Sequence, residues 1–379
     1  MKVYYYVNAR IPTEKAHGRQ IMENCHALAK QGVDVTLILP RRHNRLKKDP
    51  FVFYGLKKNF KLNQIFCFDL LPLAKGKRIF FIIEAVSFAL SALGHVLSAR
   101  GRYDVLYTRD LIIAAVFSLL NKPLFHEVHN LPDKISWWHR LIWRRCRGII
   151  VISAGLGNEL IKNKIEADKI LIARDGVNLE KFNLILSKQA AREKLKLNQE
   201  KKMVLYTGHL YSWKGADLLA RAAAELPADA AVYLVGGTAE DINNFQKKYR
   251  AANLEVVGYR PAEEIPLWLK AADVLVLPNS AKEKISSFYT SPLKLFEYLS
   301  SGRPIVAADL PSIREVLNDD NSILVPPDDL AGLAMGIGKI LNDPALAAKI
   351  STQSLRDAQQ YSWDRRVEKI IAFIKNQKS

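Results

Sequence analysis

The segment SPLKLFEYLSSGRPI (residues 291–305) has the residue types of a helix whose amino end is open to a ligand. Ser291 is a good N-cap because its hydroxyl can accept an unpaired backbone N–H, and Pro292 suits the first helical position. Gly302 ends the helix. Free N–H groups and the positive end of the helix dipole attract anions, most often phosphate. The segment therefore predicts an anion site at the amino end of helix 292–300, with a capped core helix that binds nothing as the alternative.

Two other positions carry groups that could bind charge. Lys214 precedes a glycine shortly after the apolar strand 203–207, which is a favourable place for a phosphate-binding lysine, although such a lysine is often only solvated. His129 follows another apolar strand, in HEVHN (126–130), where a lone histidine is more often structural. HEVHN is not the metalloprotease pattern, so we expect no metal there.

Apolar strands that alternate with helices must position these groups. The predicted strands are residues 2–9, 33–40, 103–109, 123–130 and 148–154 and, after the pattern restarts, 202–208, 230–237, 254–259, 272–279, 304–309 and 322–327. Such alternation predicts parallel sheets covered by helices on both faces. Two such domains in series place a cleft between the carboxyl ends of their strands, where ligands of open α/β sheets bind. We expect an α/β chain of two Rossmann-like domains facing across a cleft, with the boundary near 175–190.

Length and composition agree with two globular domains. The 379 residues exceed one ordinary core, and 49% hydrophobic residues with 16 Pro and 19 Gly exclude a disordered chain. The three cysteines, Cys25, Cys67 and Cys146, are odd in number and lack metal-ligand spacing, which favours a reducing compartment. The opening MKVYYYVNAR has no apolar run with a cleavage site, so we expect a cytoplasmic protein.

Basic charge is concentrated in the first half of the chain. Residues 1–180 hold 29 Lys and Arg against 15 Asp and Glu, which is +14 of the formal +18. An anionic partner is expected, either a nucleic acid or anionic lipid headgroups. The run WWHRLIWRRCR (137–147) mixes tryptophans with arginines, a composition typical of helices at membrane interfaces, although a helix with core tryptophans and a solvated basic face fits equally well.

The apolar stretch IFFIIEAVSFALSALGHVLS (79–98) is long enough to cross a bilayer. Glu84 and His95 argue against this, since a charged residue inside a lone span costs about 3 kcal/mol. We expect a buried or surface-docked helix instead.

Taken together, the motifs resemble glycosyltransferase family 4, the retaining nucleotide-sugar enzymes of the two-Rossmann GT-B type. The matching motifs cover nearly the whole chain: His17-Gly18-Arg19, HEVHN (126–130), ISAGLGNEL (152–160), DGVNLEKF (175–182), YTGHLYSWKG (206–215), VYLVGG (232–237), ADVLVLPN (272–279), SPLKLFEYLSSGRPIVAADLPSIREVL (291–317) and YSWD (361–364). The resemblance implies an acceptor-side domain at 1–180, joined by a C-terminal helix at 363–379, and a nucleotide-sugar-binding domain at 190–362.

The resemblance also implies roles for individual residues. The donor diphosphate would meet backbone N–H groups of Leu293 and Lys294 beside Ser291, and Lys214 would offset the charge of the departing diphosphate. Glu297 would accept the ribose hydroxyls, since a carboxylate offers only acceptors; a structural ion pair is the alternative. His129 would reach the donor sugar. Gly18 and Gly208, which lack Cβ, would admit backbone close to the ligand or merely form turns.

Three departures from the family pattern affect the site. Tyr289 stands where many members have a first glutamate, so sugar contacts would come from Tyr289 or Ser287. His209 stands where the family usually has an arginine, so Arg260 or Arg19 would have to supply the missing charge. No Asp-x-Asp occurs, so we expect no obligatory metal and no other cofactor.

The predicted function is that of a retaining hexosyltransferase acting in cell-envelope polysaccharide or glycolipid synthesis. Its partners would be a UDP- or GDP-linked sugar, a glycan or lipid-linked acceptor and an anionic membrane, which places it peripherally on the inner face of the cytoplasmic membrane. The alternatives are a nucleotide-sugar epimerase of the same fold, an inactive scaffold and a basic nucleic-acid-binding protein. We expect no nucleic acid, because no RNA-binding signature or helix-turn-helix accompanies the charge.

Overall fold

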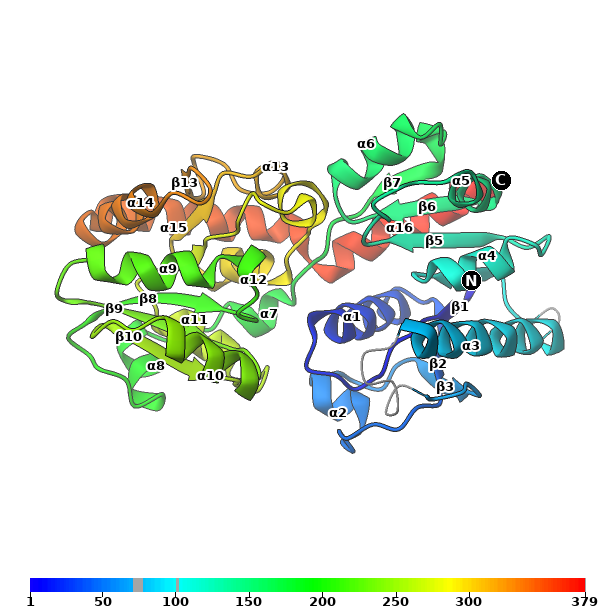
Figure 1. Ribbon diagram of the computed structural model, residues 1–379, viewed down its shortest axis with the longest axis horizontal. Coiled ribbons are helices and arrows are strands. Elements are labelled where there is room, and N and C mark those ends of the chain that lie inside the picture. The colour runs from blue at the N-terminus through cyan, green and yellow to red at the C-terminus, as the bar shows by residue number, and fades with distance from the viewer. Residues whose placement is uncertain (71–77, 100–101, 379) are drawn as a thin grey trace. The chain divides into compact units, whose positions relative to one another are not determined.

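The computed structural model describes residues 1–70, 78–99 and 102–378, and the chain divides into two units (Figure 1). Unit 1 comprises Met1–Arg174 together with Trp363–Ser379, and unit 2 comprises Asp175–Ser362. Each unit contains one parallel sheet with helices on both faces.

Unit 1 is built on a seven-stranded sheet in the order β3-β2-β1-β4-β5-β6-β7. Its strands are β1 Lys2–Tyr6, β2 Asp34–Pro40, β3 Lys61–Ile65, β4 Val105–Thr108, β5 Leu124–Val128, β6 Gly148–Val151 and β7 Ile170–Ile172. Its helices are α1 Ala16–Lys30, α2 Pro50–Tyr54, α3 Arg78–Ser98, α4 Leu111–Phe117, α5 Trp137–Arg145, α6 Ala154–Lys162, the 3₁₀ turn Ala167–Lys169 and α16 Trp363–Lys378.

The strand order decides which helices share a face of this sheet. The chain moves outward from β1 to β3 and then returns to β4 and continues the other way. Because parallel crossovers are right-handed, this reversal puts α1 on one face and α3, α4 and α5 on the other. Helix α16 packs beside α1 on the first face (Figure 1), whereas α6 lies on the face of α5, because a Cβ on its Gly157 would contact Val151, whose side chain points away from α16.

Unit 2 is built on a six-stranded sheet in the order β10-β9-β8-β11-β12-β13. Its strands are β8 Lys202–Thr207, β9 Ala230–Val235, β10 Leu254–Gly258, β11 Val274–Leu277, β12 Ile305–Ala308 and β13 Ile323–Val325. Its α-helices are α7 Leu179–Phe182, α8 Lys188–Lys194, α9 Ala216–Ala222, α10 Ala239–Lys248, α11 Ile265–Ala271, α12 Leu293–Ser301, α13 Pro311–Arg314, α14 Leu330–Asn342 and α15 Pro344–Ala358. Shorter turns are Ser212–Lys214, Ala223–Glu225, Gln359–Tyr361 and the π-helical turn Ile285–Tyr289.

The predicted strands are confirmed, and two further strands were missed. β3 lies at one edge of its sheet, and its sequence KLNQI has too few apolar residues to read as a strand. β7 lies at the opposite edge and has only three residues. Edge strands need less burial than central ones, so their sequence signal is weaker.

Candidate functional site

The amino end of α12 differs in detail from the prediction. The helix begins at Leu293, and Pro292 occupies the N-cap position with an extended backbone (ψ 122°). The Ser291 hydroxyl lies one residue too early to cap the helix, and it accepts the backbone N–H of Asp175 at 3.0 Å instead. The prediction that Ser291 caps this helix is therefore wrong. The first amides of α12, at Leu293 and Lys294, still lack acceptors within the helix by its geometry.

Lys294 is the charged side chain that the sequence did not assign to the site. Its side chain is buried, and its Nζ lies 3.9 Å from the centre of the Tyr206 ring. Within the described part of the chain, this Nζ has no hydrogen-bond partner. Burial, followed by the positive charge of Lys214, holds the pKa of Lys294 well below its usual range, although Glu297 opposes the shift. A buried amine without a partner is costly unless a ligand uses it.

Lys214 lies at the end of the turn Ser212–Lys214, which follows β8. Its Nζ sits 5.2 Å from the Trp213 ring and 5.4 Å from the Tyr211 ring, and burial lowers its pKa to about 8. The next residue, Gly215, has a φ of 73°. A Cβ at Gly215 would lie 1.7 Å from the carbonyl oxygen of Pro278, so only glycine lets this loop pack on the segment after β11.

Two contacts bring α12 and the loop after β8 together. The Tyr298 hydroxyl of α12 accepts the backbone N–H of Thr207, the last residue of β8, at 2.8 Å. A Cβ on Gly208, whose φ is 131°, would lie 3.9 Å from Cδ of Lys294. Gly208 therefore lies directly against the buried lysine. The structure brings Lys214, Lys294 and the half-buried Glu297 to one region of unit 2.

The positions that depart from the family pattern lie in the loop after β8 and in the turn before α12. The ring of His209 stacks on that of Tyr211, with centroids 5.1 Å apart. Tyr289 is the last residue of the π-helical turn before α12, and Ser287 in the same turn donates to the carbonyl of Ala281. Arg260 lies 4.0 Å from Glu264, an acidic neighbour that already offsets part of its charge. The sequence predicted that Arg260 or Arg19 would supply the missing charge; Arg19 lies on α1 of unit 1, and the buried cation of this region is Lys294.

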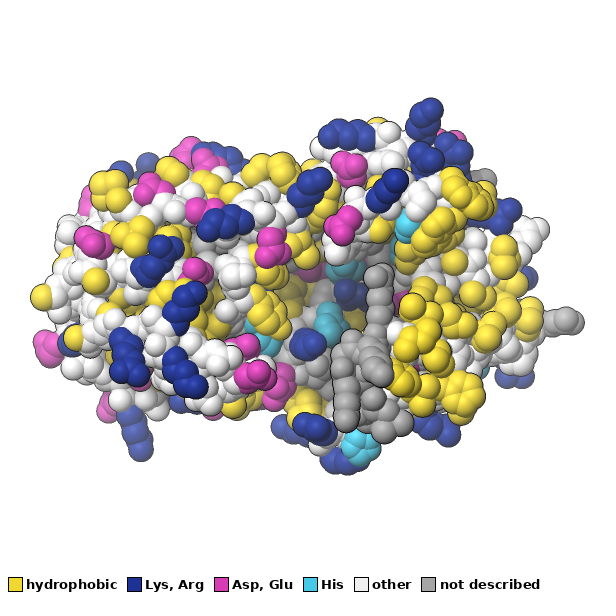
Figure 2. Space-filling view, viewed as in Figure 1, with side chains coloured by type: hydrophobic (Ala, Val, Ile, Leu, Met, Phe, Trp, Pro, Cys, Tyr) yellow, Lys and Arg dark blue, Asp and Glu magenta, His cyan; other side chains and the backbone are white. Residues whose placement is uncertain are grey.

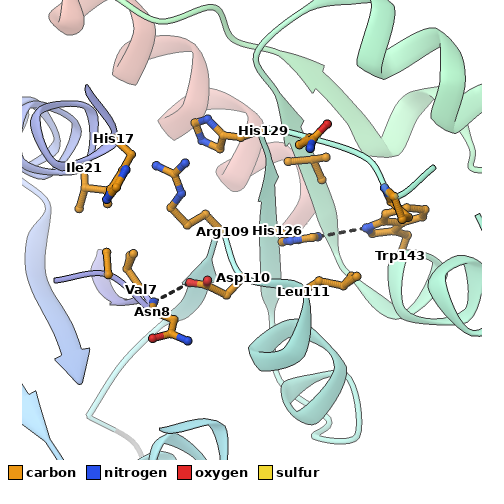
Figure 3. Close-up of a pocket in the computed structure, with 14 residues that line it drawn as sticks. Val7, Asn8, His17, Ile21, Arg109, Asp110, Leu111, His126, His129 and Trp143 are labelled. Atoms are coloured by element: carbon orange, nitrogen blue, oxygen red, sulfur yellow. Dashed lines mark hydrogen bonds between the residues drawn. The ribbon is translucent and has the colours of Figure 1, made fainter. Parts of the chain in front are cut away.

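Unit 1 contains a pocket of about 350 Å³ at the carboxyl ends of its central strands (Figure 3). Histidine and arginine side chains line it together with a buried tryptophan: His17, Arg109, His126, His129 and Trp143. Figure 3 shows the Arg109 guanidinium between His17 and His129. Arg109 donates to the side-chain oxygen of Gln20 at 2.8 Å. The pocket is thus able to bind an anionic or hydroxyl-rich molecule.

Glu127, which follows His126 on β5, does not line this pocket but is hydrogen-bonded to His129, which does. Its carboxylate is fully buried and accepts hydrogen bonds from four side chains: Gln20, Tyr107, His129 and Arg366. Burial alone would raise its pKa, but Arg366 on α16 and the hydrogen bonds from His129 and Tyr107 outweigh burial and hold the pKa well below the usual range. Glu127 is therefore a buried carboxylate ion, a role that the sequence motifs did not predict.

The hydrogen bonds of the two histidines define their tautomers. Because a carboxylate only accepts, Nε2 of His129 donates to Glu127 over 2.7 Å, which leaves Nδ1 as an acceptor. The Trp143 indole donates to Nδ1 of His126 over 3.1 Å. Burial, and for His129 also Arg109, lowers the pKa of each histidine to about 4. Both rings are neutral at physiological pH.

Gly18 has a packing explanation inside unit 1. It is the third residue of α1, and a Cβ there would lie 2.2 Å from the Tyr54 hydroxyl. Tyr54 in turn donates to the carbonyl oxygen of Thr13 at 2.8 Å. The close approach that Gly18 permits is therefore to a side chain of the same unit.

Metal ligands do not cluster in the described residues: no group of three or more His, Cys, Asp or Glu side chains there could hold an ion. The sequence expectation of no metal stays a prediction.

Comparison with known sequences shows two family matches, one in each unit. The sequence model of Glycosyltransferase Family 4 matches residues 17–181, and that of Glycosyl transferases group 1 matches residues 201–343. The D-inositol 3-phosphate glycosyltransferase of Streptomyces scabiei is 28% identical over 302 residues, which is 70% of this chain and 66% of that protein. An uncharacterised glycosyltransferase of Methanocaldococcus jannaschii is 23% identical over 86% of this chain and 83% of its own length. The D-inositol 3-phosphate glycosyltransferase of Streptomyces avermitilis is matched over 47% of its length, so the chain spans less than two thirds of these Streptomyces relatives.

Comparison with solved structures shows the fold. Sucrose-phosphate synthase from Thermosynechococcus elongatus superposes with a TM-score of 0.78 and 19% identity, covering 99% of both chains. The HepE protein of Anabaena, solved with UDP and also with UDP-glucose, gives TM-scores of 0.74 and 0.75 at 17% identity, covering 99% of this chain and 100% of that protein. With the two parallel sheets, these similarities establish the predicted α/β GT-B fold. They do not favour the epimerase or nucleic-acid alternatives.

Proposed function

Because the chain belongs to glycosyltransferase family 4, we propose that it transfers a sugar from a nucleotide-sugar donor to an acceptor hydroxyl with retention of configuration. The observation that carries this proposal is the pair of lysines beside the amino end of α12, the half-buried Lys214 and the buried Lys294. A diphosphate is the ligand that best matches two ammonium groups and a helix amino end. The expected donor is UDP- or GDP-linked, and the UDP complexes of HepE make UDP the first to test.

Charge compensation of the leaving group is the main catalytic contribution of unit 2. As the bond between the anomeric carbon and the diphosphate oxygen breaks, negative charge develops on that oxygen. Lys214, Lys294 and the first amides of α12 stabilise this charge in a site that is partly removed from water. The acceptor oxygen forms its bond to the same face of the anomeric carbon, and its proton passes to the departing diphosphate. Glu297 accepts hydrogen bonds from the ribose hydroxyls and positions the nucleoside.

The pocket of unit 1 is proposed to hold sugar hydroxyls of the substrates. His129 is neutral and donates to Glu127, so its Nδ1 can accept a hydroxyl hydrogen bond without competing charge. Arg109 offers donors to an anionic or hydroxyl group beside it. Glu127 acts as a positioning residue, because it holds the tautomer and the orientation of His129.

We further propose that no metal ion is obligatory. The two lysines and the helix amino end supply the positive charge that a divalent cation would otherwise bring to the diphosphate. Turnover is therefore expected to survive treatment with EDTA, whereas reversible loss of turnover would contradict this part of the proposal.

The acceptor is proposed to be a glycan or lipid-linked molecule of cell-envelope polysaccharide or glycolipid synthesis, reached by peripheral binding to the inner face of the cytoplasmic membrane. The support is the +14 charge of residues 1–180 and helix α5, on which Trp137 and Trp138 are exposed while Trp143 is buried. Arg144 and Arg145 on the same helix are exposed. Exposed aromatic and basic side chains on one helix fit an interface with anionic headgroups.

The experiment is a donor panel of UDP-, GDP- and ADP-sugars assayed for hydrolysis and transfer, with Lys214→Ala, Glu297→Ala and the exposed control Lys282→Ala. Loss of Lys214 should lower kcat by about 10²–10³, because a charge that acts on the leaving group is removed. Loss of Glu297 should mainly raise KM, by about tenfold to a hundredfold. Unchanged kinetics in both variants would refute these roles, and conversion of the donor without an acceptor into an epimer would refute the reaction.

A further inference from the structure

Helix α3 in unit 1 buries polar residues together with one apolar side and leaves a second apolar side exposed. Glu84 is only 2% exposed and forms an ion pair with Arg42. The Tyr6 hydroxyl and Nδ1 of His95 are hydrogen-bonded at 2.7 Å, and the Ser87 hydroxyl accepts the backbone N–H of Phe68 at 2.9 Å. These contacts attach the helix to the sheet and to the segment after β3. By length and composition alone α3 could cross a membrane, but a crossing would break the Glu84 ion pair.

The outer side of α3 is a continuous apolar surface. Side chains that are large, hydrophobic and exposed lie along it at Ile79, Ile82, Ile83, Val86, Leu90 and Leu97, and Leu90 is 58% exposed. Phe66 and Phe68, which follow β3, are also exposed, and their rings pack edge to face at 5.0 Å. In Figure 2 hydrophobic side chains gather over the part of the view that contains α3 in Figure 1. Soluble surfaces rarely leave so many large apolar side chains together.

The exposed charged side chains that the structure describes on α3, α4 and α5 are all basic. Glu84 is the only acidic residue in α3, and it is buried; α4 and α5 contain none. α5, on the same face, adds the exposed Arg144 and Arg145. An apolar surface with basic and aromatic side chains on the same face, and without exposed carboxylates on these three helices, complements the hydrocarbon edge and the phosphate headgroups of an anionic bilayer.

We propose that the outer side of α3, with Phe66 and Phe68, inserts shallowly into an anionic lipid bilayer while the helix stays packed on its sheet. The inference rests on the proposed function in one respect, because the proposed function places the acceptor at the membrane. It adds a hydrophobic component to the electrostatic binding proposed above. Salt screens the attraction of arginines to headgroups but leaves the burial of apolar side chains intact, so binding that persists at high salt identifies insertion.

The test is sedimentation of the full-length protein with vesicles of equal parts phosphatidylglycerol and phosphatidylcholine, at about 0.1 M and about 1 M salt. The variant is Val86→Ser/Leu90→Ser, which changes two exposed side chains one turn apart on the outer side of α3. The matched control is Met335→Ser, an exposed apolar residue on α14 of unit 2. Thermal unfolding and hydrolysis of the donor in lipid-free buffer are measured for each protein, because both should be unchanged.

The wild-type protein should bind these vesicles at low salt and retain part of that binding at high salt. The double variant should partition at least tenfold more weakly and lose binding at high salt, while the Met335 control should match the wild type. Three results would overturn the inference: equal binding by wild type and double variant, complete release of the wild type by salt, or a lipid-free dimer that the double substitution dissociates. If vesicle binding follows the prediction but no nucleotide binds, the result supports the membrane-binding surface and contradicts the proposed function.

Discussion

Lys294 combines features that make sense only when the site is occupied. Its amine is buried, lies over the ring of Tyr206, and has no hydrogen-bond partner among the described residues. Burial and the neighbouring Lys214 lower its pKa, so the ligand-free site holds fewer charges than two lysines would carry in water. A diphosphate favours the protonated amines, so its binding should take up protons.

This reasoning predicts opposite effects of Lys294→Met on stability and binding. The substitution removes a buried amine, so the thermal midpoint of the ligand-free protein should stay equal or rise. Affinity for UDP or its sugar conjugates should fall by about tenfold to a hundredfold, because a charged hydrogen bond to phosphate is lost. Calorimetric titration measures both the affinity and the proton uptake, with the exposed Lys282→Met as the control. Wild-type affinity in Lys294→Met would exclude Lys294 from the site.

The pH dependence of the affinity for a diphosphate follows from the lowered pKa of Lys214. The folded pKa of Lys214 is about 8, below its usual value of 10.5, so the ligand-free lysine loses its proton as the pH rises through 8. The bound state holds more protons than the free state, and affinity for the diphosphate should therefore decrease above pH 8. Titrations on either side of pH 8 check this, and an affinity that rises with pH would contradict it.

The residues of the site were only partly predictable. Lys214 and Glu297 could be selected because their sequence contexts resemble a family motif. For Lys294 the sequence signal was a lysine within an apolar helical run, which identifies its burial but not the proximity of Tyr206 and Lys214. Glu127 lies within HEVHN and was overlooked, because the partner that keeps it ionised, Arg366, is more than two hundred residues away in sequence.

Among the elements, β5 and α16 are joined by the buried pair Glu127 and Arg366. Arg366 is 4% exposed and donates to Glu127 at 2.8 Å and also to Asn24 of α1. The C-terminal helix thus contributes the charge that pairs with Glu127, the hydrogen-bond partner of the pocket residue His129. Removing one member of a buried ion pair leaves the other uncompensated, which is far more costly than loss of a neutral hydrogen bond.

We therefore predict that Glu127→Gln lowers the free energy of unfolding at pH 7 by about 3–5 kcal/mol, whereas Tyr107→Phe, which keeps the charge, costs about 1 kcal/mol. The folded pKa of Glu127 lies below its usual 4.5, so its stabilisation is present above that value and is lost as the pH falls through the folded pKa. Urea unfolding at neutral and acidic pH measures this. Equal losses in the two variants would show that the charge of Glu127 is unimportant.

The elements themselves were largely predictable, because central parallel strands are continuous apolar runs. The start of α12 was not, since Ser291 and Pro292 have ideal composition for a helix start one residue earlier. The serine hydroxyl instead bonds to the backbone of Asp175, a partner distant in sequence. Local composition identifies a cap only when no such partner competes for the same hydroxyl.

At the scale of the whole molecule, the alternation of strands and helices was sufficient to predict two parallel sheets, which the comparisons confirm as a GT-B fold. The chain divides after Arg174, and residues from Trp363 onward return to unit 1. The excess of basic residues predicted an anionic partner but not its location. Only the structure shows that α3 buries Glu84 and leaves one of its apolar sides exposed.

The most direct test of the central claim is hydrogen–deuterium exchange of the full chain with and without UDP, repeated with GDP. The account predicts slower exchange at residues 208–216 and 291–297 with at least one of these nucleotides, and little change there in Lys214→Ala. Protection confined to other segments, or protection of these segments that Lys214→Ala retains in full, would contradict a diphosphate site built from Lys214, Lys294 and the amino end of α12.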